Sequence, residues 1–369
     1  NGGLFVSWLS DGNYHIYLQY LNPLGEPQLG QGGMVVSDNQ NASWIAVYHL
    51  NLSVDHEGNA IITTVDQRTG GVWEVYAYKV GPDGTMYWGD NGVALSSSGV
   101  NNMSPRLAIM DDNSVIVTWT HNDNSVLFQH ISSGGTLLWG DGILIADNNA
   151  TLLSPNPIIT TNGSMLIQWI RQTGPFWAAN SELYLQKYDY DGNSMWSDPV
   201  VAAGPVVFPM GNWLQQSHPD ANSGSFSAWT AMSGNVQSAA AQHIDVDGSL
   251  SWAGGVEFSD NTNHFRISPR LAIAESNQDL IAVWNESNSG QSQRGVYAQR
   301  LDNSGNKLWG SNGTAVIELN NDHDYLDLSV QGLGDDIIST YIEQTVNMNG
   351  DIYATRLDQN GASVWENGR

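Results

Sequence analysis

The chain has 369 residues, with 12 basic side chains, 37 acidic side chains and a formal net charge of −25. This balance repels phosphate backbones and anionic membranes, so we expect no nucleic-acid partner and no direct membrane insertion. Cysteine is absent, which excludes a disulfide framework, a thiol nucleophile and Cys-ligated metal sites.

One hairpin pattern, Gly-x-x-x-Trp, recurs in chain order. It begins at Gly25, where Leu29 replaces the tryptophan, and the later copies end at Trp88, Trp139, Trp196, Trp252, Trp309 and Trp365. The successive spacings are 59, 51, 57, 56, 57 and 56 residues. Seven copies at a period of this size indicate a propeller or a solenoid.

Each copy is preceded by further strand patterns, which we name A to D in chain order. In the sixth copy, residues 268–273 (SPRLAI) are strand A, and strand B ends on an aromatic residue at Trp284. Residues 296–301 (VYAQRL) alternate as strand C, and strand D runs from residue 306 (NKLW onward). Ser-Pro opens strand A in three copies, and Pro suits the first residue of a strand.

These patterns predict an all-β fold, a seven-bladed β-propeller of four-stranded antiparallel blades. The recurring tryptophans are then packing between blades. The chain opens with NGGLFVSW, which is already strand B. We therefore expect residues 1–369 to be a single β-propeller domain, excised from a longer chain, whose first blade lacks its innermost strand.

Two stretches carry a resemblance to a known group of proteins. Residues 296–313 (VYAQRLDNSGNKLWGSNG) and 351–365 (DIYATRLDQNGASVW) resemble the repeats of bacterial secreted or surface β-propeller proteins, common among Bacteroidetes. The resemblance covers essentially the whole chain. It implies an extracellular or cell-surface location, other domains in a longer parent chain, and cargo of type IX secretion.

A function is expected where the repeat is broken, on the face formed by the B–C and D–A connections. The fourth-blade loop and the crossing after it add Phe176, Trp177 and Trp213 beside Arg171. Neighbouring loops add polar and aromatic candidates, namely Arg68, Trp73, His264, Arg266 and Arg294. Aromatic rings with Arg and amides suit a sugar, and several Arg would also select an acidic polysaccharide or a peptide carboxylate.

A charged or His position recurs in strand C, at Lys79, His130, Lys187, His243, Arg300 and Arg356. Equivalent strand-C positions lie away from the propeller axis, so these groups cannot converge on one anion. We expect structural pairing with carboxylates in the nearby turns, such as Asp245, Asp302 and Asp358.

We predict no cofactor and no metal site. If calcium binds on the ligand face, Asp322, Asp324 and Asp327 are the residues of an acidic loop that would hold it. The leading hypothesis is a non-catalytic binding or adhesion module for a carbohydrate or a cell-surface protein. Two alternatives stay open. One is a structural or protein-interaction domain, and the other is a polysaccharide lyase or glycoside hydrolase built from residues such as His121, His264 and Tyr325.

Overall fold

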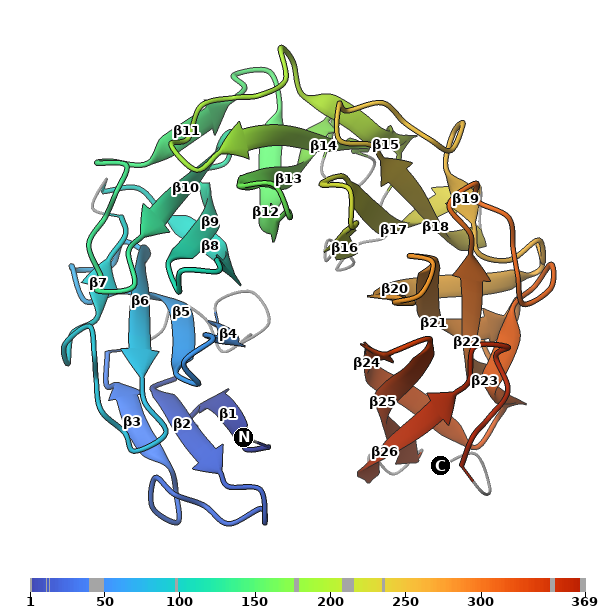
Figure 1. Ribbon diagram of the computed structural model, residues 1–369, viewed down its shortest axis with the longest axis horizontal. Coiled ribbons are helices and arrows are strands. Elements are labelled where there is room, and N and C mark those ends of the chain that lie inside the picture. Colours follow the sequence, from blue (N-terminus) through green and yellow to red (C-terminus); the bar gives the residue numbers. More distant parts are fainter. Residues whose placement is uncertain are drawn as a thin grey trace. The chain divides into compact units, whose positions relative to one another are not determined.

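The computed structural model describes residues 2–10, 12, 14–39, 50–96, 99–175, 179–207, 216–233, 236–345 and 349–365. These residues form 26 strands in seven antiparallel sheets of three or four strands, which confirms the predicted all-β seven-bladed propeller (Figure 1). No helix in this part of the chain is long and apolar enough to span a membrane.

The chain divides into two compact units, and the first comprises residues 1–159, 165–172 and 187–195. Its first sheet contains β1 (Leu4–Leu9), β2 (Ile16–Leu21) and β3 (Met34–Ser37). The second contains β4 (Leu50–Val54), β5 (Ala60–Asp66), β6 (Glu74–Val80) and β7 (Val93–Ala94). The third contains β8 (Asn102–Ile109), β9 (Val115–His121), β10 (Ser125–Ile131) and β11 (Ile143–Ala146).

The fourth sheet contributes residues to both units. Its strands are β12 (Thr151–Ile159), β13 (Ser164–Thr173), β14 (Asn180–Asp189) and β15 (Val200–Val206). In the first sheet, β1 holds Trp8 and is therefore a strand B. The three described strands of that sheet thus correspond to B, C and D.

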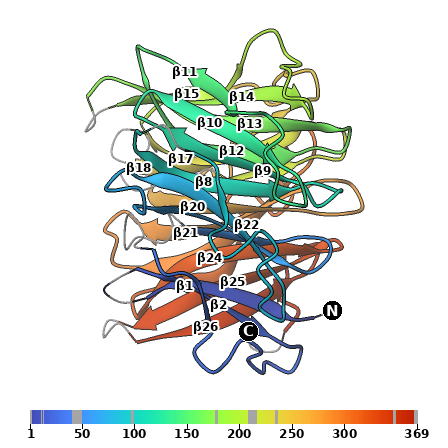
Figure 2. The same ribbon diagram turned by 90° about the vertical axis from the view of Figure 1, so that its left-hand side faces the viewer.

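The second unit comprises residues 160–164, 173–186 and 196–369. Its first sheet contains β16 (Gln216–Pro219), β17 (Ser225–Ser233), β18 (Val236–Ile244) and β19 (Val256–Glu257). The next contains β20 (His264–Ile273), β21 (Leu280–Asn288), β22 (Arg294–Leu301) and β23 (Thr314–Asn320). The last contains β24 (His323–Leu333), β25 (Asp336–Thr345) and β26 (Gly350–Leu357). Figures 1 and 2 show the last two of these sheets side by side.

The Ser-Pro pairs lie inside strand A and do not open it, contrary to the sequence-based expectation. Strand β20 begins at His264, and its pairing with β21 shifts register between Ile267 and Arg270. Ser268 lies in this bulge with a φ of 55°. The equivalent bulges hold Ser104, Ser154 and Asp327, all with positive φ. A bulge leaves one residue unpaired, so it accommodates a proline without an N–H as well as a strand end does.

Two of these bulges turn a backbone N–H toward the preceding blade. The Ser268 N–H donates to Thr230 Oγ1 at 3.1 Å, and the Ser154 N–H donates to Thr120 Oγ1 at 3.3 Å. Both threonines lie one residue after the strand-B aromatic, and both are buried. The bulge therefore ties two blades together with a hydrogen bond that a regular strand would not offer.

The strongest repeated contact joins one hairpin to the next. Trp309 is 8% exposed and packs on Gly361, where an added Cβ would lie 2.9 Å from the indole Cδ2. Its Nε1 also donates to the Gln359 carbonyl at 3.1 Å. The same contact between a hairpin residue and the glycine of the following hairpin joins Leu29 to Gly84, Trp88 to Gly135, Trp139 to Gly192, Trp196 to Gly248 and Trp252 to Gly305.

These glycines satisfy two requirements at once. Gly361 has a φ of +80° and Gly305 a φ of +82°, a region that residues with a Cβ rarely adopt. Each also leaves the space that the indole occupies. Glycine thus allows both the hairpin turn and the close approach of the hairpin residue from the neighbouring blade.

The strand-C cations are paired structurally, as expected, but with different carboxylates. Their partners lie in the turn between strands A and B, in the pairs Lys79–Asp55, His243–Asp220, Arg300–Asp279 and Arg356–Asp336, with nitrogen–oxygen distances of 2.6–2.8 Å. His130 instead contacts Ser114 Oγ at 2.8 Å.

The expected partners have another role. Asp302 and Asp358 accept backbone N–H groups of their own hairpin turns, and Asp245 accepts the hydroxyls of Ser249 and Ser251. The register explains this difference, because strand C pairs directly with strand B, and the A–B turn enters strand B beside the cation.

Replacing Trp309 by Ala should lower the free energy of unfolding by about 3–5 kcal/mol, the range for deleting a large buried aromatic residue. Trp365 occupies the same repeat slot but is 36% exposed, so Trp365→Ala is a matched control with an expected change within about 0.5 kcal/mol. Urea unfolding of both variants measures the difference. Equal losses would show that the indole–glycine contact is not what makes Trp309 important.

Thr230→Val removes the acceptor of the bulge N–H while keeping the side-chain shape. We expect a loss of about 1–3 kcal/mol in unfolding free energy, because a buried donor is left without a partner. Thr230→Ser keeps the hydroxyl and should retain more of the stability than Thr230→Val does. If the serine variant is the less stable one in urea unfolding, the methyl group and not the hydrogen bond is important.

The Asp220–His243 pair makes stability depend on pH. Burial opposes ionisation of Asp220, but hydrogen bonds from His243 and from the Gly224 and Asn222 amides outweigh it, so the pKa of Asp220 is lowered. A lowered pKa gives stability that is present above the pKa of the unfolded chain and is lost as pH falls through the folded-state pKa.

Asp220→Asn keeps the size of the side chain but removes the charge. We expect its unfolding free energy to change less than that of the parent chain between pH 5 and about pH 2. Urea unfolding at several pH values tests this, and parallel curves for the two proteins would contradict it.

Candidate functional site

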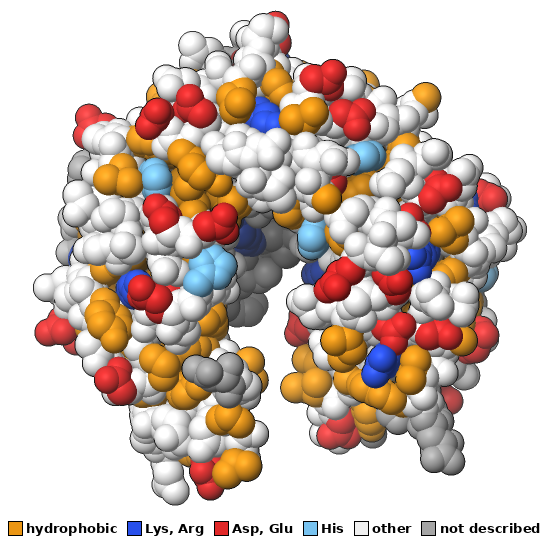
Figure 3. Space-filling view, viewed as in Figure 1, with side chains coloured by type: hydrophobic (Ala, Val, Ile, Leu, Met, Phe, Trp, Pro, Cys, Tyr) orange, Lys and Arg blue, Asp and Glu red, His pale blue; other side chains and the backbone are white. Residues whose placement is uncertain are grey.

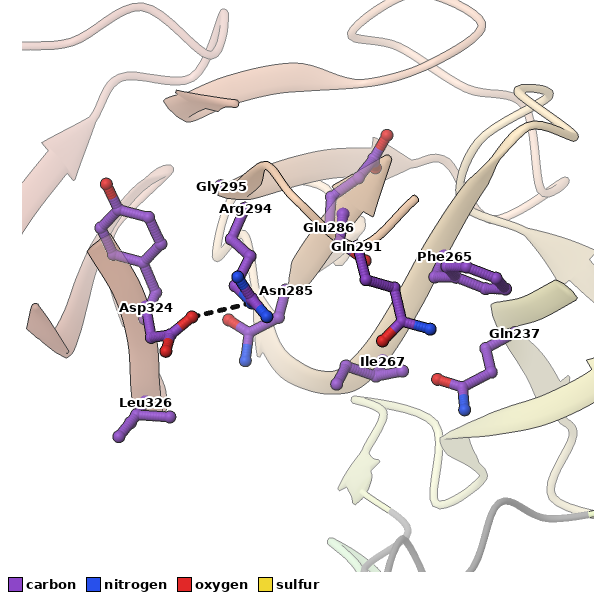
Figure 4. Close-up of a pocket in the computed structure, with 12 residues that line it drawn as sticks. Gln237, Phe265, Ile267, Asn285, Glu286, Gln291, Arg294, Gly295, Asp324 and Leu326 are labelled. Atoms are coloured by element: carbon purple, nitrogen blue, oxygen red, sulfur yellow. Dashed lines mark ion pairs between the residues drawn. The ribbon is translucent and has the colours of Figure 1, made fainter. Parts of the chain in front are cut away.

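A pocket of about 310 Å³ opens in the second unit, where three blades meet (Figure 4). Its walls come from the start of strand A and the turn between strands B and C, the regions in which a site was expected. Phe265 and Ile267 on β20 form one side, and Tyr325 and Leu326 on β24 contribute from the next blade. We call this cavity the Phe265 pocket.

Amide side chains supply much of its polar surface. Gln237 comes from β18, Asn285 from β21 and Gln291 from the turn that follows. The Oδ1 of Asn285 is buried and has no hydrogen-bond partner among the described residues. A buried acceptor without a donor is destabilising, so this atom favours a ligand that donates a hydrogen bond.

Arg294 and Asp324 face each other at the pocket (Figure 4). Arg294 Nε lies 2.7 Å from Asp324 Oδ1, and both side chains are nearly half exposed. The contact is an ion pair without hydrogen-bond alignment, so Asp324 Oδ1 is a second buried acceptor that lacks an aligned donor. At this exposure the ion pair itself contributes little to stability.

Glu286 is a buried carboxylate at the same pocket. Its Oε2 accepts from the Trp284 indole at 2.8 Å, and its Oε1 lies 2.7 Å from His264 Nδ1. These two contacts satisfy both oxygens and fix the imidazole of His264 by one of its nitrogens. Glu286 thus orients a histidine on the neighbouring strand.

Arg266 does not belong to this pocket, although it lies on the same strand. Side chains alternate along β20, so Phe265 and Ile267 line the pocket whereas Arg266 is 1% exposed. Its guanidinium donates to the Asn261 carbonyl and lies 3.5 Å from Glu257. The interpretation of Arg266 as a ligand-binding residue does not fit this burial.

Arg68 and Trp73 lie in the first unit and have structural contacts. Arg68 pairs with Asp66 at 2.7 Å, stacks over the Tyr76 ring at 3.6 Å and bonds to the Tyr78 hydroxyl at 2.5 Å. Trp73 packs against a hydrophobic cluster of that unit. Neither residue lines the Phe265 pocket.

Arg171 is likewise engaged, because its Nε lies 2.7 Å from Asp147 Oδ2. The aromatic residues expected beside it, Phe176, Trp177 and Trp213, lie outside the described residues. Of the sequence-based candidates, Arg294, Asp324 and Tyr325 line the Phe265 pocket, and His264 contacts its Glu286.

The acidic segment after Asn320 is not a loop as predicted, because β24 begins at His323. Asp324 faces Arg294, and Asp327 lies in the bulge of this strand. Within the described residues, no group of three His, Asp or Glu side chains gathers in a way that could hold a metal ion.

Sequence reasoning missed the amides and Glu286. Glu286 lies two residues after the strand-B aromatic, and Asp66, His121, Arg171 and Glu343 occupy the same slot in other blades. A polar or charged residue at this slot is therefore the sequence signal that was available. Gln237 lies near the start of β18 and Gln291 in a turn, and at neither position does the amide follow a distinguishing pattern.

The surface around the site reflects the composition. On the face shown in Figure 3, Asp and Glu side chains are scattered widely, whereas Lys and Arg are few. At the pocket, Arg294 faces Asp324 and the nearby His264 faces Glu286.

Comparisons with known proteins support the fold but do not establish a function. No family model and no curated protein matches the chain. An ulvan lyase, a polysaccharide lyase solved in complex with -[GlcA(1-4)Rha3S]-, is similar with a TM-score of 0.62 and 9% identity, over 98% of this chain and 91% of the lyase.

Two further solved structures are less similar. A protein of unknown function from Dyadobacter fermentans has a TM-score of 0.45 and 10% identity, over 84% of this chain and 94% of that one. An α-L-arabinanase from Penicillium chrysogenum has a TM-score of 0.45 and 11% identity, over 85% and 94%. At 9% identity, the likeness to the ulvan lyase shows a shared fold alone, and a shared fold does not imply a shared function.

Proposed function

We propose that this chain is a non-catalytic carbohydrate-binding module that takes its ligand in the Phe265 pocket. The observation that supports this most is the combination of an aromatic wall with three amides and two buried acceptors that lack an aligned donor. Ligand sites are usually concave and apolar with a few placed polar groups, and this pocket has that character. A sugar offers a C–H face for the ring and hydroxyls for the acceptors.

Binding is favoured over catalysis by the state of the carboxylates. Both oxygens of Glu286 are occupied by Trp284 and His264, and Asp324 faces Arg294. A glycosidase needs one carboxyl group that protonates the leaving oxygen and a second that acts as base or nucleophile. Groups held by neighbouring side chains suit orientation of a ligand better than proton transfer.

A polysaccharide lyase is the second candidate, and one observation favours it. Glu286 holds His264 Nδ1 at 2.7 Å, the kind of contact that orients an imidazole for general-base catalysis. The ulvan lyase likeness supports only the fold for this candidate. New chain ends after incubation of the protein with polysaccharides would favour the lyase over the binding module.

The proposed location is extracellular or on the cell surface. The absence of cysteine and the repeat resemblance support a bacterial surface protein, with type IX secretion as the proposed route. A partner that is a cell-surface protein, or a purely structural role, stays the alternative. Fractionation of the producing cells, with the protein detected by antibody, tests the location.

Phe265→Ala should weaken binding to a retained polysaccharide by more than about fivefold, corresponding to about 1 kcal/mol, because the ring lines the pocket and its contact with the sugar would be lost. Tyr87→Ala is the control, since Tyr87 is 55% exposed and lies in a hairpin of the first unit. Affinity electrophoresis measures binding, and the melting temperature checks folding. Unchanged binding by folded Phe265→Ala would move the site elsewhere.

A further inference from the structure

We infer that the Phe265 pocket selects a neutral sugar surface and rejects a uronate. This inference rests on the proposed function and names its ligand class. It replaces the broader expectation that several Arg on one rim would select an acidic polysaccharide. Three features of the pocket lead to it: the surplus of acceptors, the pairing of the cations and the amides.

The acceptors come first. Asn285 Oδ1 and Asp324 Oδ1 are buried without an aligned donor. A sugar hydroxyl can donate to either of them, whereas an ionised carboxylate only accepts hydrogen bonds. A uronate keeps its ring hydroxyls as donors, but its carboxylate replaces one hydroxyl that could donate and brings a further acceptor beside these atoms. A neutral sugar, with a hydroxyl in place of each carboxylate, matches this arrangement.

The charges lead to the same conclusion. Arg294 lies 2.7 Å from Asp324, and His264 lies 2.7 Å from Glu286. Arg294 thus already has its carboxylate, and His264 already has a hydrogen-bond partner in Glu286. A uronate would have to displace Asp324 from Arg294, and the displaced carboxylate would then repel it at short range.

The amides complete the match. Gln237 from β18 and Gln291 from the turn after β21 each carry two N–H donors and one acceptor oxygen (Figure 4). They can pair with neutral hydroxyls in either direction without a change of protonation. Recognition by amides and by Asn285 Oδ1, with Arg294 already paired to Asp324, therefore predicts binding that depends little on salt, unlike recognition by free Arg.

Affinity electrophoresis of the 369-residue chain tests the inference with matched polymers. The probes are a galactan, a glucomannan and a mixed-linkage β-glucan, each before and after oxidation of its C6 hydroxyls to carboxylates. We expect retardation by at least one neutral polymer at both low salt and 0.5 M salt, and an affinity about tenfold weaker for its oxidised form. Equal or stronger binding of the oxidised form would overturn the inference alone. Retardation by none of them would overturn the proposed function as well.

A variant pair separates the pocket from the net charge of the chain. Asp324→Asn frees Arg294, so binding of the oxidised polymer should rise several-fold. Asp191→Asn makes the same charge change in an exposed hairpin turn outside the pocket and should have no such effect. If the two variants behave alike, the discrimination belongs to the net charge and not to the pocket, and the inference is wrong.

Discussion

The contact between one hairpin's indole and the next hairpin's glycine is the interaction on which the rest of this fold depends. It explains why the sequence period is so regular, because each blade must present both a ring and a receiving glycine at a fixed distance along the chain. Trp309 on Gly361 shows both parts of it, with the indole Nε1 bonded to the turn carbonyl beside that glycine. The bulge hydrogen bond from Ser268 to Thr230 adds a second link between blades.

These links leave other positions free to vary. The first residues of strand A and the residues of the B–C turn take part in neither the indole–glycine contact nor the bulge hydrogen bond. At these positions the sixth blade carries Phe265, Gln291 and Arg294, which together line one pocket. The slot two residues after the strand-B aromatic illustrates the variation, since it holds Glu286 in this blade and His121 in the third. A rigid repeat thus supports a site that belongs to one place only.

The fold could be predicted from the sequence because a residue needed for packing recurs in every copy. The site could not, because its residues come from three blades and from strands whose side chains alternate in direction. Arg266 and Phe265 are neighbours in sequence, yet one is buried beside Glu257 and the other lines the pocket. The sequence pattern could not place the Ser-Pro pairs within strand A, because a missing N–H is tolerated at a bulge as well as at a strand end.

The acidic composition and the ligand chemistry have a common cause. The chain has 12 Lys and Arg residues against 37 Asp and Glu residues, so carboxylates outnumber the cations that could pair with them. Lys79 and Arg300 are paired inside blades, and Arg294 is paired at the pocket. Where the cations already have partners, recognition falls to amides and to acceptors without donors. Such a site discriminates by hydroxyl geometry rather than by charge.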